Sequence, residues 1–106
     1  MDLHQLALER SLAYHCVIAE RLVQDPGILD KARERVKEWL AQTPDRPYVR
    51  QWNKILTGDA QAIAAFLVDR GELAEELRQS SPFAGVLNPR ERWRIWRETR
   101  ERFAGR

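Results

Sequence analysis

Histidine and cysteine, two residue types common in catalytic and metal sites, are rare in this 106-residue chain, which contains two histidines and one cysteine. The two histidines, His4 and His15, are separated by about 16 Å along a helix axis, too far to share a metal ion or a proton. Cys16 follows His15 directly, but neighbouring helical side chains point in different directions, so the two cannot act as nucleophile and base. We therefore predict a non-enzyme, with no catalytic residue, no metal site and no cofactor.

One acidic cluster could in principle bind a metal ion or transfer protons, and it consists of Asp69, Glu72, Glu75 and Glu76. Such work requires carboxylates whose pKa values are shifted by burial or by close pairing. On an amphipathic helix that turns Leu73 and Leu77 inward, these four side chains would face water. We interpret them as a solvated face. The chain also contains no glycine-rich phosphate loop, no Gly-x-Ser-x-Gly and no His-Glu-x-x-His motif.

The last 19 residues have the most distinctive composition. Residues 88–106 contain seven arginines and three glutamates, a net charge of +4, whereas residues 1–87 have a net charge of −2. Tryptophan and arginine are enriched at the energetic centres of protein interfaces, and arginine also binds carboxylates and phosphates with two parallel hydrogen bonds. We predict a partner-binding surface made of Phe83, Arg90, Trp93, Arg94, Trp96 and Arg97.

The segment that precedes this region, residues 80–89, is too apolar for a flexible linker, because it contains Phe83, Val86 and Leu87. Two interpretations are open. The segment either packs back over the core or forms part of a docking groove.

Apolar residues recur at helical spacing between breakers, and no segment alternates with the period of a strand. We predict an all-α single domain spanning 1–106, an orthogonal or irregular bundle of about five helices. A break near Gly71 is the alternative to a continuous fourth helix. Asp25, Asp59 and Asn88 are expected N-caps, and 88–104 forms a basic Arg/Trp C-terminal helix. The helices are expected over residues 2–24, from Pro26 to the breakers at 43–47, and over 46–56, 60–79 and 88–103.

The first 24 residues are not expected to be a secretory signal or a membrane span, because Glu9, Arg10, Glu20 and Arg21 interrupt their apolar residues. The single cysteine leaves no internal disulfide to form. We therefore expect a cytoplasmic protein without membrane contact.

A nucleic-acid partner is the second choice. Helices at 46–56 and from residue 60 have the turn length of a helix-turn-helix, but the second one begins Ala60-Gln61-Ala62-Ile63, where only Gln61 can contact a base edge. Phosphate contacts from the arginines of 88–104 are the better route to nucleic acid. A protein partner explains the aromatic residues as well, and a homodimer through the last helix is a further alternative.

Two stretches of the chain are similar to a known group of proteins. The first is Leu77-Arg78-Gln79-Ser80-Ser81-Pro82-Phe83-Ala84-Gly85-Val86-Leu87 with Pro89, Arg92 and Trp93, and the second is Leu8-Glu9-Arg10-Ser11-Leu12-Ala13-Tyr14-His15. The chain resembles small helical bacterial proteins encoded in toxin–antitoxin gene pairs. The resemblance implies a non-catalytic antitoxin that binds and neutralises a partner toxin, itself an enzyme in several such pairs. The alternative function is a nucleic-acid-binding transcriptional regulator that uses the C-terminal arginine-rich helix.

Overall fold

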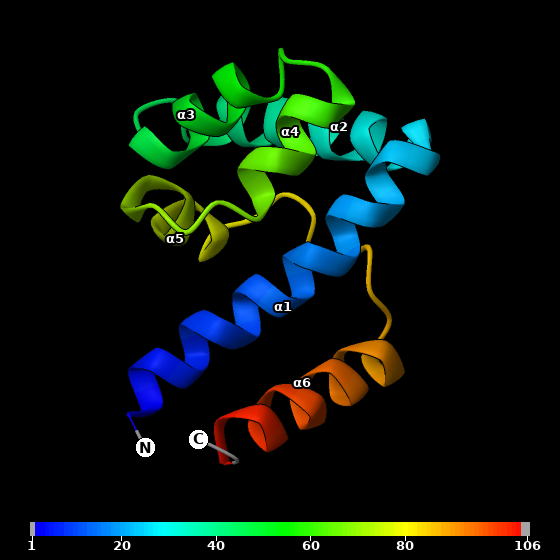
Figure 1. Ribbon diagram of the computed structural model, residues 1–106. Helices are drawn as coiled ribbons and strands as arrows, with labels where there is room; N and C mark the ends of the chain where they lie inside the picture. Colours follow the sequence, from blue (N-terminus) through cyan, green and yellow to red (C-terminus); the bar gives the residue numbers. More distant parts are fainter. Residues whose placement is uncertain (1, 105–106) are drawn as a thin grey trace.

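The structure is a computed structural model that describes residues 2–104. These residues form one all-α domain without strands, as predicted, although it contains six helices rather than five. Figure 1 shows the long first helix crossing the molecule, with the last helix along one side of it and the other four gathered toward the opposite side. The helices are α1 (Leu3–Gln24), α2 (Pro26–Gln42), α3 (Pro47–Ile55), α4 (Ala60–Leu67), α5 (Glu72–Arg78) and α6 (Pro89–Ala104).

Short polar side chains set the helix starts where the sequence predicts them. The Asp25 carboxylate accepts a hydrogen bond from the Gly27 N–H (3.0 Å), and Pro26 occupies the first helical position. Asp59 caps α4 through the Ala62 N–H (2.8 Å). Each carboxylate satisfies a backbone N–H that has no partner within its own helix. The caps thereby separate α1 from α2 and α3 from α4.

The predicted continuous helix over 60–79 is wrong, because the chain breaks between Leu67 and Glu72. The Asp69 carboxylate accepts the Gly71 N–H at 2.6 Å, which stabilises a turn instead of another helical bond. The Arg78 guanidinium donates to the Leu67 and Asp69 carbonyls at 3.2 and 2.6 Å, holding the end of α4 against α5. As a consequence Leu73, expected to point inward, is 46% exposed, whereas Leu77 is buried.

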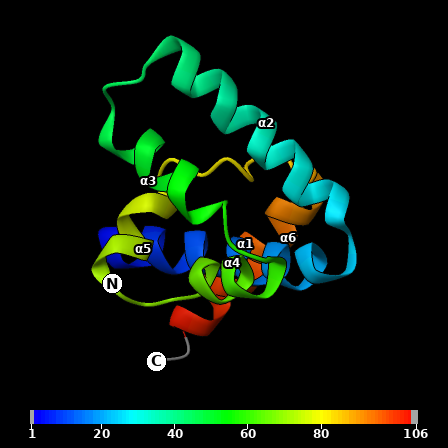
Figure 2. The same cartoon turned by 90° about the horizontal axis from the view of Figure 1, so that it is seen from above.

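The core lies where α1, α2, α4 and the segment before α6 converge, and its largest buried side chain is Trp52. The Trp52 ring meets Phe66 and Phe83 edge-on, at centroid distances of 5.8 and 6.1 Å. Edge-to-face pairs of this kind stabilise a core beyond the area they bury. In Figure 2, seen from above, α2 and α3 extend to one side of this centre.

Several faces of α1 are covered, because it contacts α2, α4, α5 and α6. Its buried apolar residues are Leu6, Leu12, Ile18, Ala19 and Leu22, whereas Cys16 and Val23 are exposed. No helix within residues 2–104 is both long enough and apolar enough to cross a membrane.

Candidate functional site

The basic C-terminal helix begins with the predicted capping box. The Asn88 side chain accepts the Glu91 N–H at 2.8 Å, and the Glu91 carboxylate accepts the Asn88 N–H at 3.2 Å. Glu91 also forms an ion pair with Arg21 of α1. The Arg21 hydrogen bond lowers the pKa of Glu91 below its ordinary value, and the same bond raises the pKa of Arg21. The start of α6 is therefore fixed to α1.

The inner face of α6 packs on α1, with which it runs antiparallel (Figure 1). Its buried residues are Ile95 and Thr99, one turn apart. The Thr99 hydroxyl donates to the Ile95 carbonyl at 2.8 Å, so its polar atom is satisfied although the residue is completely buried. This narrow apolar contact fixes which side of α6 faces solvent.

The outer face of α6 carries four of the six residues predicted to bind a partner. Arg90, Arg94 and Arg97 are exposed, and Trp93 is 57% exposed, the largest aromatic side chain left in solvent. Within residues 2–104 no carboxylate lies within ion-pair distance of any of these three arginines. We call Arg90, Trp93, Arg94 and Arg97 the outer face. Its charge and its indole are both free to contact another molecule.

Trp96 lies elsewhere, on the side of α6 that turns toward α1. The Arg10 and Arg100 guanidinium carbons stand 4.9 and 5.6 Å from its ring centroid. These cation–π contacts and its partial burial make Trp96 a support for the packing of α6 on α1. It is not part of the outer face.

Phe83 is also placed differently from the prediction. Only 1% of its surface is exposed, and its ring contacts Trp52 in the core. Leu87 is buried as well, and Val86 is partly buried against the core. Of the two interpretations of residues 80–89, the core-packed one is therefore correct, because apolar surface gains more from the core than from water. Phe83 is structural and has no surface to offer a partner.

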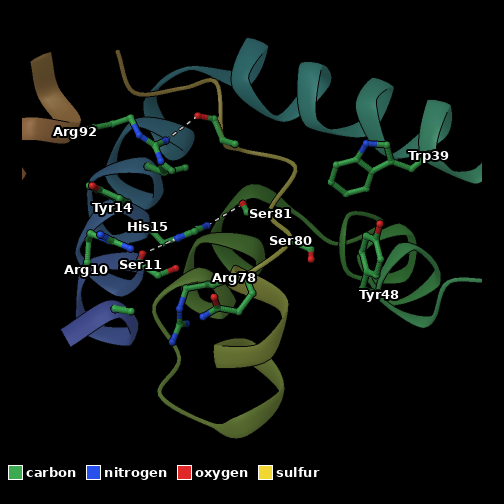
Figure 3. Close-up of a pocket in the computed structure, with 14 residues that line it drawn as sticks. Arg10, Ser11, Tyr14, His15, Trp39, Tyr48, Arg78, Ser80, Ser81 and Arg92 are labelled. Atoms are coloured by element: carbon green, nitrogen blue, oxygen red, sulfur yellow. Dashed lines mark hydrogen bonds between the residues drawn. The ribbon is translucent and has the colours of Figure 1, made fainter. Parts of the chain in front are cut away.

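A second feature is a partly open cavity of about 680 Å³, lined by residues of α1, α2, α3, α5, α6 and the segment before α6. Figure 3 shows Arg10, Tyr14 and Arg92 at one end, Trp39 and Tyr48 at the other, and His15 with Ser81 between them. These residues come from four helices and a loop that are distant in sequence. A cavity of this volume is in the range of small-molecule sites.

His15 is the titratable group at the centre of this cavity. Its Nδ1 lies 2.7 Å from the Ser11 carbonyl, which can only accept, so Nδ1 carries the proton. Its Nε2 lies 2.8 Å from the Ser81 hydroxyl, which then donates. Burial, together with the smaller effect of the positive charges of Arg78 and Arg92, lowers the pKa of His15 from 6.5 to about 4, against the opposing effect of the Ser11 carbonyl. The imidazole is therefore neutral at pH 7.

Arg78, at the floor of the cavity, is only 5% exposed. Its Nη1 makes both of its hydrogen bonds, to the Leu67 and Asp69 carbonyls. Burial lowers its pKa below the ordinary value, although the negative charges of Glu75 and Asp69 oppose this. In the described part of the chain, neither the Glu75 nor the Asp69 carboxylate lies within ion-pair distance of the Arg78 guanidinium. Arg78 thus lines the cavity and has no carboxylate of residues 2–104 within ion-pair distance.

Comparisons with known proteins assign no relative. No protein-family model, curated protein or solved structure matches this chain. In the part of the chain that the structure describes, no group of three His, Cys, Asp or Glu side chains is placed to hold a metal ion. Function is therefore inferred from the outer face and from the cavity.

The hydrogen bond between Ser81 and His15 has the geometry of a nucleophile and its base, with the Ser11 carbonyl in the orienting position. A base with a pKa near 4 accepts a proton poorly at neutral pH, since general bases work best when their pKa is near the operating pH. The Ser81 oxygen also accepts the Phe83 N–H at 3.1 Å, which fixes the loop. The pair connects residues 80–89 to α1.

Sequence reasoning missed the cavity because its members are far apart in the chain. The sequence pairs His15 only with its near neighbours Cys16 and His4, whereas its hydrogen-bond partner Ser81 is 66 residues away. Arg78 gave no signal at all, since an arginine near the end of a helix usually lies in water. The outer face was visible in the sequence because its residues lie within one helix.

Proposed function

We propose that this chain is a non-catalytic protein-interaction domain, an antitoxin that binds an acidic surface of its toxin through the outer face of α6. The observation that carries the proposal is the exposed Trp93 among three exposed arginines without carboxylate partners. A solvent-exposed indole gains from burial, and unpaired guanidinium groups gain from a carboxylate on a second molecule. The resemblance to proteins of toxin–antitoxin gene pairs supports the same role.

The rigidity of α6 supports this proposal. The capping box, the Arg21–Glu91 ion pair and the buried Ile95 and Thr99 hold the helix before any partner arrives. A surface that is already ordered loses little conformational entropy on binding, which favours affinity. Arg90, Trp93 and Arg97 lie within an arc of roughly 60° of the helix, at about 100° per residue, so they can contact one surface together.

The charge of the outer face specifies the partner's chemistry. Three cations around an aromatic ring complement a groove lined by carboxylates with an apolar pocket at its centre. Active sites that process phosphate groups provide such grooves, because their carboxylates hold metal ions. Insertion of α6 into a site of this kind would prevent the toxin's substrate from binding there.

The test uses the product of the gene adjacent to the one that encodes this chain. Growth arrest by that product should be relieved by co-expression of the wild-type chain, and the two proteins should co-purify. Trp93→Ala should weaken the complex by about 2 kcal/mol or more, roughly 30-fold, as expected for an interface hot spot. Replacing Arg90, Arg94 and Arg97 together by Glu should abolish rescue and leave the thermal midpoint of unfolding nearly unchanged.

A matched control makes the same charge change elsewhere. Lys37, Arg46 and Lys54 are exposed and lie outside α6, so their triple replacement by Glu should leave rescue intact. Loss of rescue by both triple variants would show a general charge effect and contradict the outer face. Unfolding of the α6 variant would instead show that its arginines are structural.

Nucleic acid binding through the same arginines is the competing outcome. It predicts that log Kd for a 20-base-pair DNA changes linearly and steeply with log salt concentration, by nearly one unit of slope per phosphate contact. Affinity for DNA that depends on Arg90, Arg94 and Arg97, without any complex with the neighbouring gene product, would replace the antitoxin proposal. A homodimer would appear as a doubled mass in sedimentation that Trp93→Ala reduces.

A further inference from the structure

The cavity described above has an unusual balance of charge. Its lining includes three arginines, Arg10 from α1, Arg78 from α5 and Arg92 from α6, and no aspartate or glutamate of the described chain. Like charges brought to one cavity repel each other, and the repulsion is strongest where water is excluded. An anion in the cavity would relieve it.

Arg78 is the most buried of these three arginines. Only 5% of Arg78 is exposed, and within the described residues only its Nη1 makes hydrogen bonds. A guanidinium has five N–H donors, so Nε and Nη2 remain available. An oxyanion bound to these donors would add a counter-charge to the more distant ones of Glu75 and Asp69.

Arg10 and Arg92 are held in position by aromatic rings. The Arg92 guanidinium carbon lies 4.8 Å from the Tyr14 ring centroid, and that of Arg10 lies 4.9 Å from the Trp96 centroid. Arg92 also donates one N–H to the Ala84 carbonyl at 3.2 Å. Contact through the flat face of a guanidinium leaves N–H groups at its edges free for a forked pair of hydrogen bonds to an oxyanion. Figure 3 shows both arginines at the same end of the cavity.

The opposite end of the cavity is aromatic. Trp39 and Tyr48 pack edge-to-face with centroids 5.9 Å apart, and both are partly buried. Rings at a cavity wall favour an apolar or planar part of a ligand. The cavity therefore has a cationic end and an aromatic end, and its volume exceeds the needs of an inorganic ion alone.

We propose that this cavity binds a phosphate monoester that carries a planar ring, a nucleoside monophosphate or the 5′-phosphorylated end of an RNA strand. Arg10, Arg78 and Arg92 hold the phosphate, and Trp39 and Tyr48 contact the ring. The neutral His15 adds no negative charge to the site and keeps the Ser81 loop in place. The cavity is separate from the outer face, so this ligand proposal does not depend on the antitoxin proposal.

The test is isothermal titration calorimetry at 50 mM salt and pH 7 with the full chain. The probes are adenosine 5′-monophosphate, adenosine and inorganic phosphate. Adenosine 5′-monophosphate should bind at least tenfold more tightly than either of the other two. A double variant, Arg10→Gln with Arg92→Gln, should weaken its binding at least tenfold, and Trp39→Leu should weaken it while leaving the affinity for inorganic phosphate unchanged.

A control variant, Arg94→Gln with Arg97→Gln, removes the same charge from the outer face and should bind as the wild type does. Circular dichroism of each variant checks that the helices remain folded. A trinucleotide with a 5′-phosphate that binds more tightly than adenosine 5′-monophosphate would assign the site to RNA ends, and weaker binding would assign it to the free nucleotide.

Three results would overturn the proposal. One is that none of the probes gives a heat of binding at concentrations up to millimolar. Another is adenosine binding as tightly as its phosphate, which would remove the role of the arginines. The last is equal loss of affinity in the cavity variant and in the outer-face control, which would reduce the effect to net charge.

Discussion

Acidification should destabilise this protein through His15, and the size of the effect follows from its surroundings. Burial lowers the pKa of His15 to about 4 in the folded chain, against 6.5 for an exposed histidine. A lowered pKa means that the unfolded chain takes up the proton first. The free energy of unfolding is therefore unaffected by His15 above about pH 7 and falls as the pH drops from 6.5 toward 4. With about 1.4 kcal/mol for each pKa unit, the loss is about 2 kcal/mol at pH 5 and about 3 kcal/mol at pH 4.

The structure explains why protonation is costly. A proton on Nε2 would make this nitrogen a donor to the Ser81 oxygen, which also accepts the Phe83 N–H, so the Ser81 hydroxyl hydrogen would lose Nε2 as its acceptor. The new charge would also lie near Arg78 and Arg92, which are both positive. Protonation should thus loosen residues 80–89 from α1 before the whole domain unfolds.

The assay is urea denaturation of the wild type and of His15→Gln at pH 7 and pH 5. Glutamine is neutral at both values, so the difference in free energy of unfolding between the two proteins should shrink by about 2 kcal/mol at the lower pH. His4 is exposed, and His4→Gln is the matched control that should show no such change. If the difference in free energy of unfolding between the wild type and His15→Gln is the same at pH 7 and pH 5, the burial argument is refuted. An NMR titration midpoint of His15 near 6.5 would refute it as well.

Three further predictions test the packing. Phe83→Ala should lower the free energy of unfolding by about 3–5 kcal/mol in chemical denaturation, because it empties a core position; a near-zero change would return Phe83 to the surface. Asn88→Ala should cost about 1 kcal/mol and lower the thermal midpoint, since it removes one half of the capping box, and an unchanged midpoint would mean that α6 does not depend on its cap. Leu73→Ser should change stability by less than about 0.5 kcal/mol and Leu77→Ser by several times more; comparable losses would contradict the break between α4 and α5.

The break between α4 and α5 shows where periodicity fails as a guide. The spacing of Ile63, Leu67 and Leu77 fits one helix, and the sequence marks Gly71 only as an alternative. The decision depends on Arg78, which binds the carbonyls at the end of α4 from one helix away. Helix propensity cannot predict this contact, because Arg78 reaches the carbonyls of Leu67 and Asp69 only when the turn between α4 and α5 has formed.

Residues 80–89 illustrate the same division. Their apolar residues predict that the segment is covered by something, but the sequence leaves open whether a partner or the chain's own core covers it. Trp52, about 30 residues earlier, supplies the ring against which Phe83 packs. The choice is therefore a property of the assembled core.

The sequence by itself determined the all-α class, the caps at Asp25, Asp59 and Asn88, and the concentration of arginine and tryptophan in the last helix. These features depend on hydrogen bonds and charges within a few residues of one another, so they can be read along the chain. Tertiary structure alone decided which side of α6 faces water and which side chains surround His15. Both depend on contacts between helices that are far apart in sequence, and only their packing fixes the burial and the charge at each site.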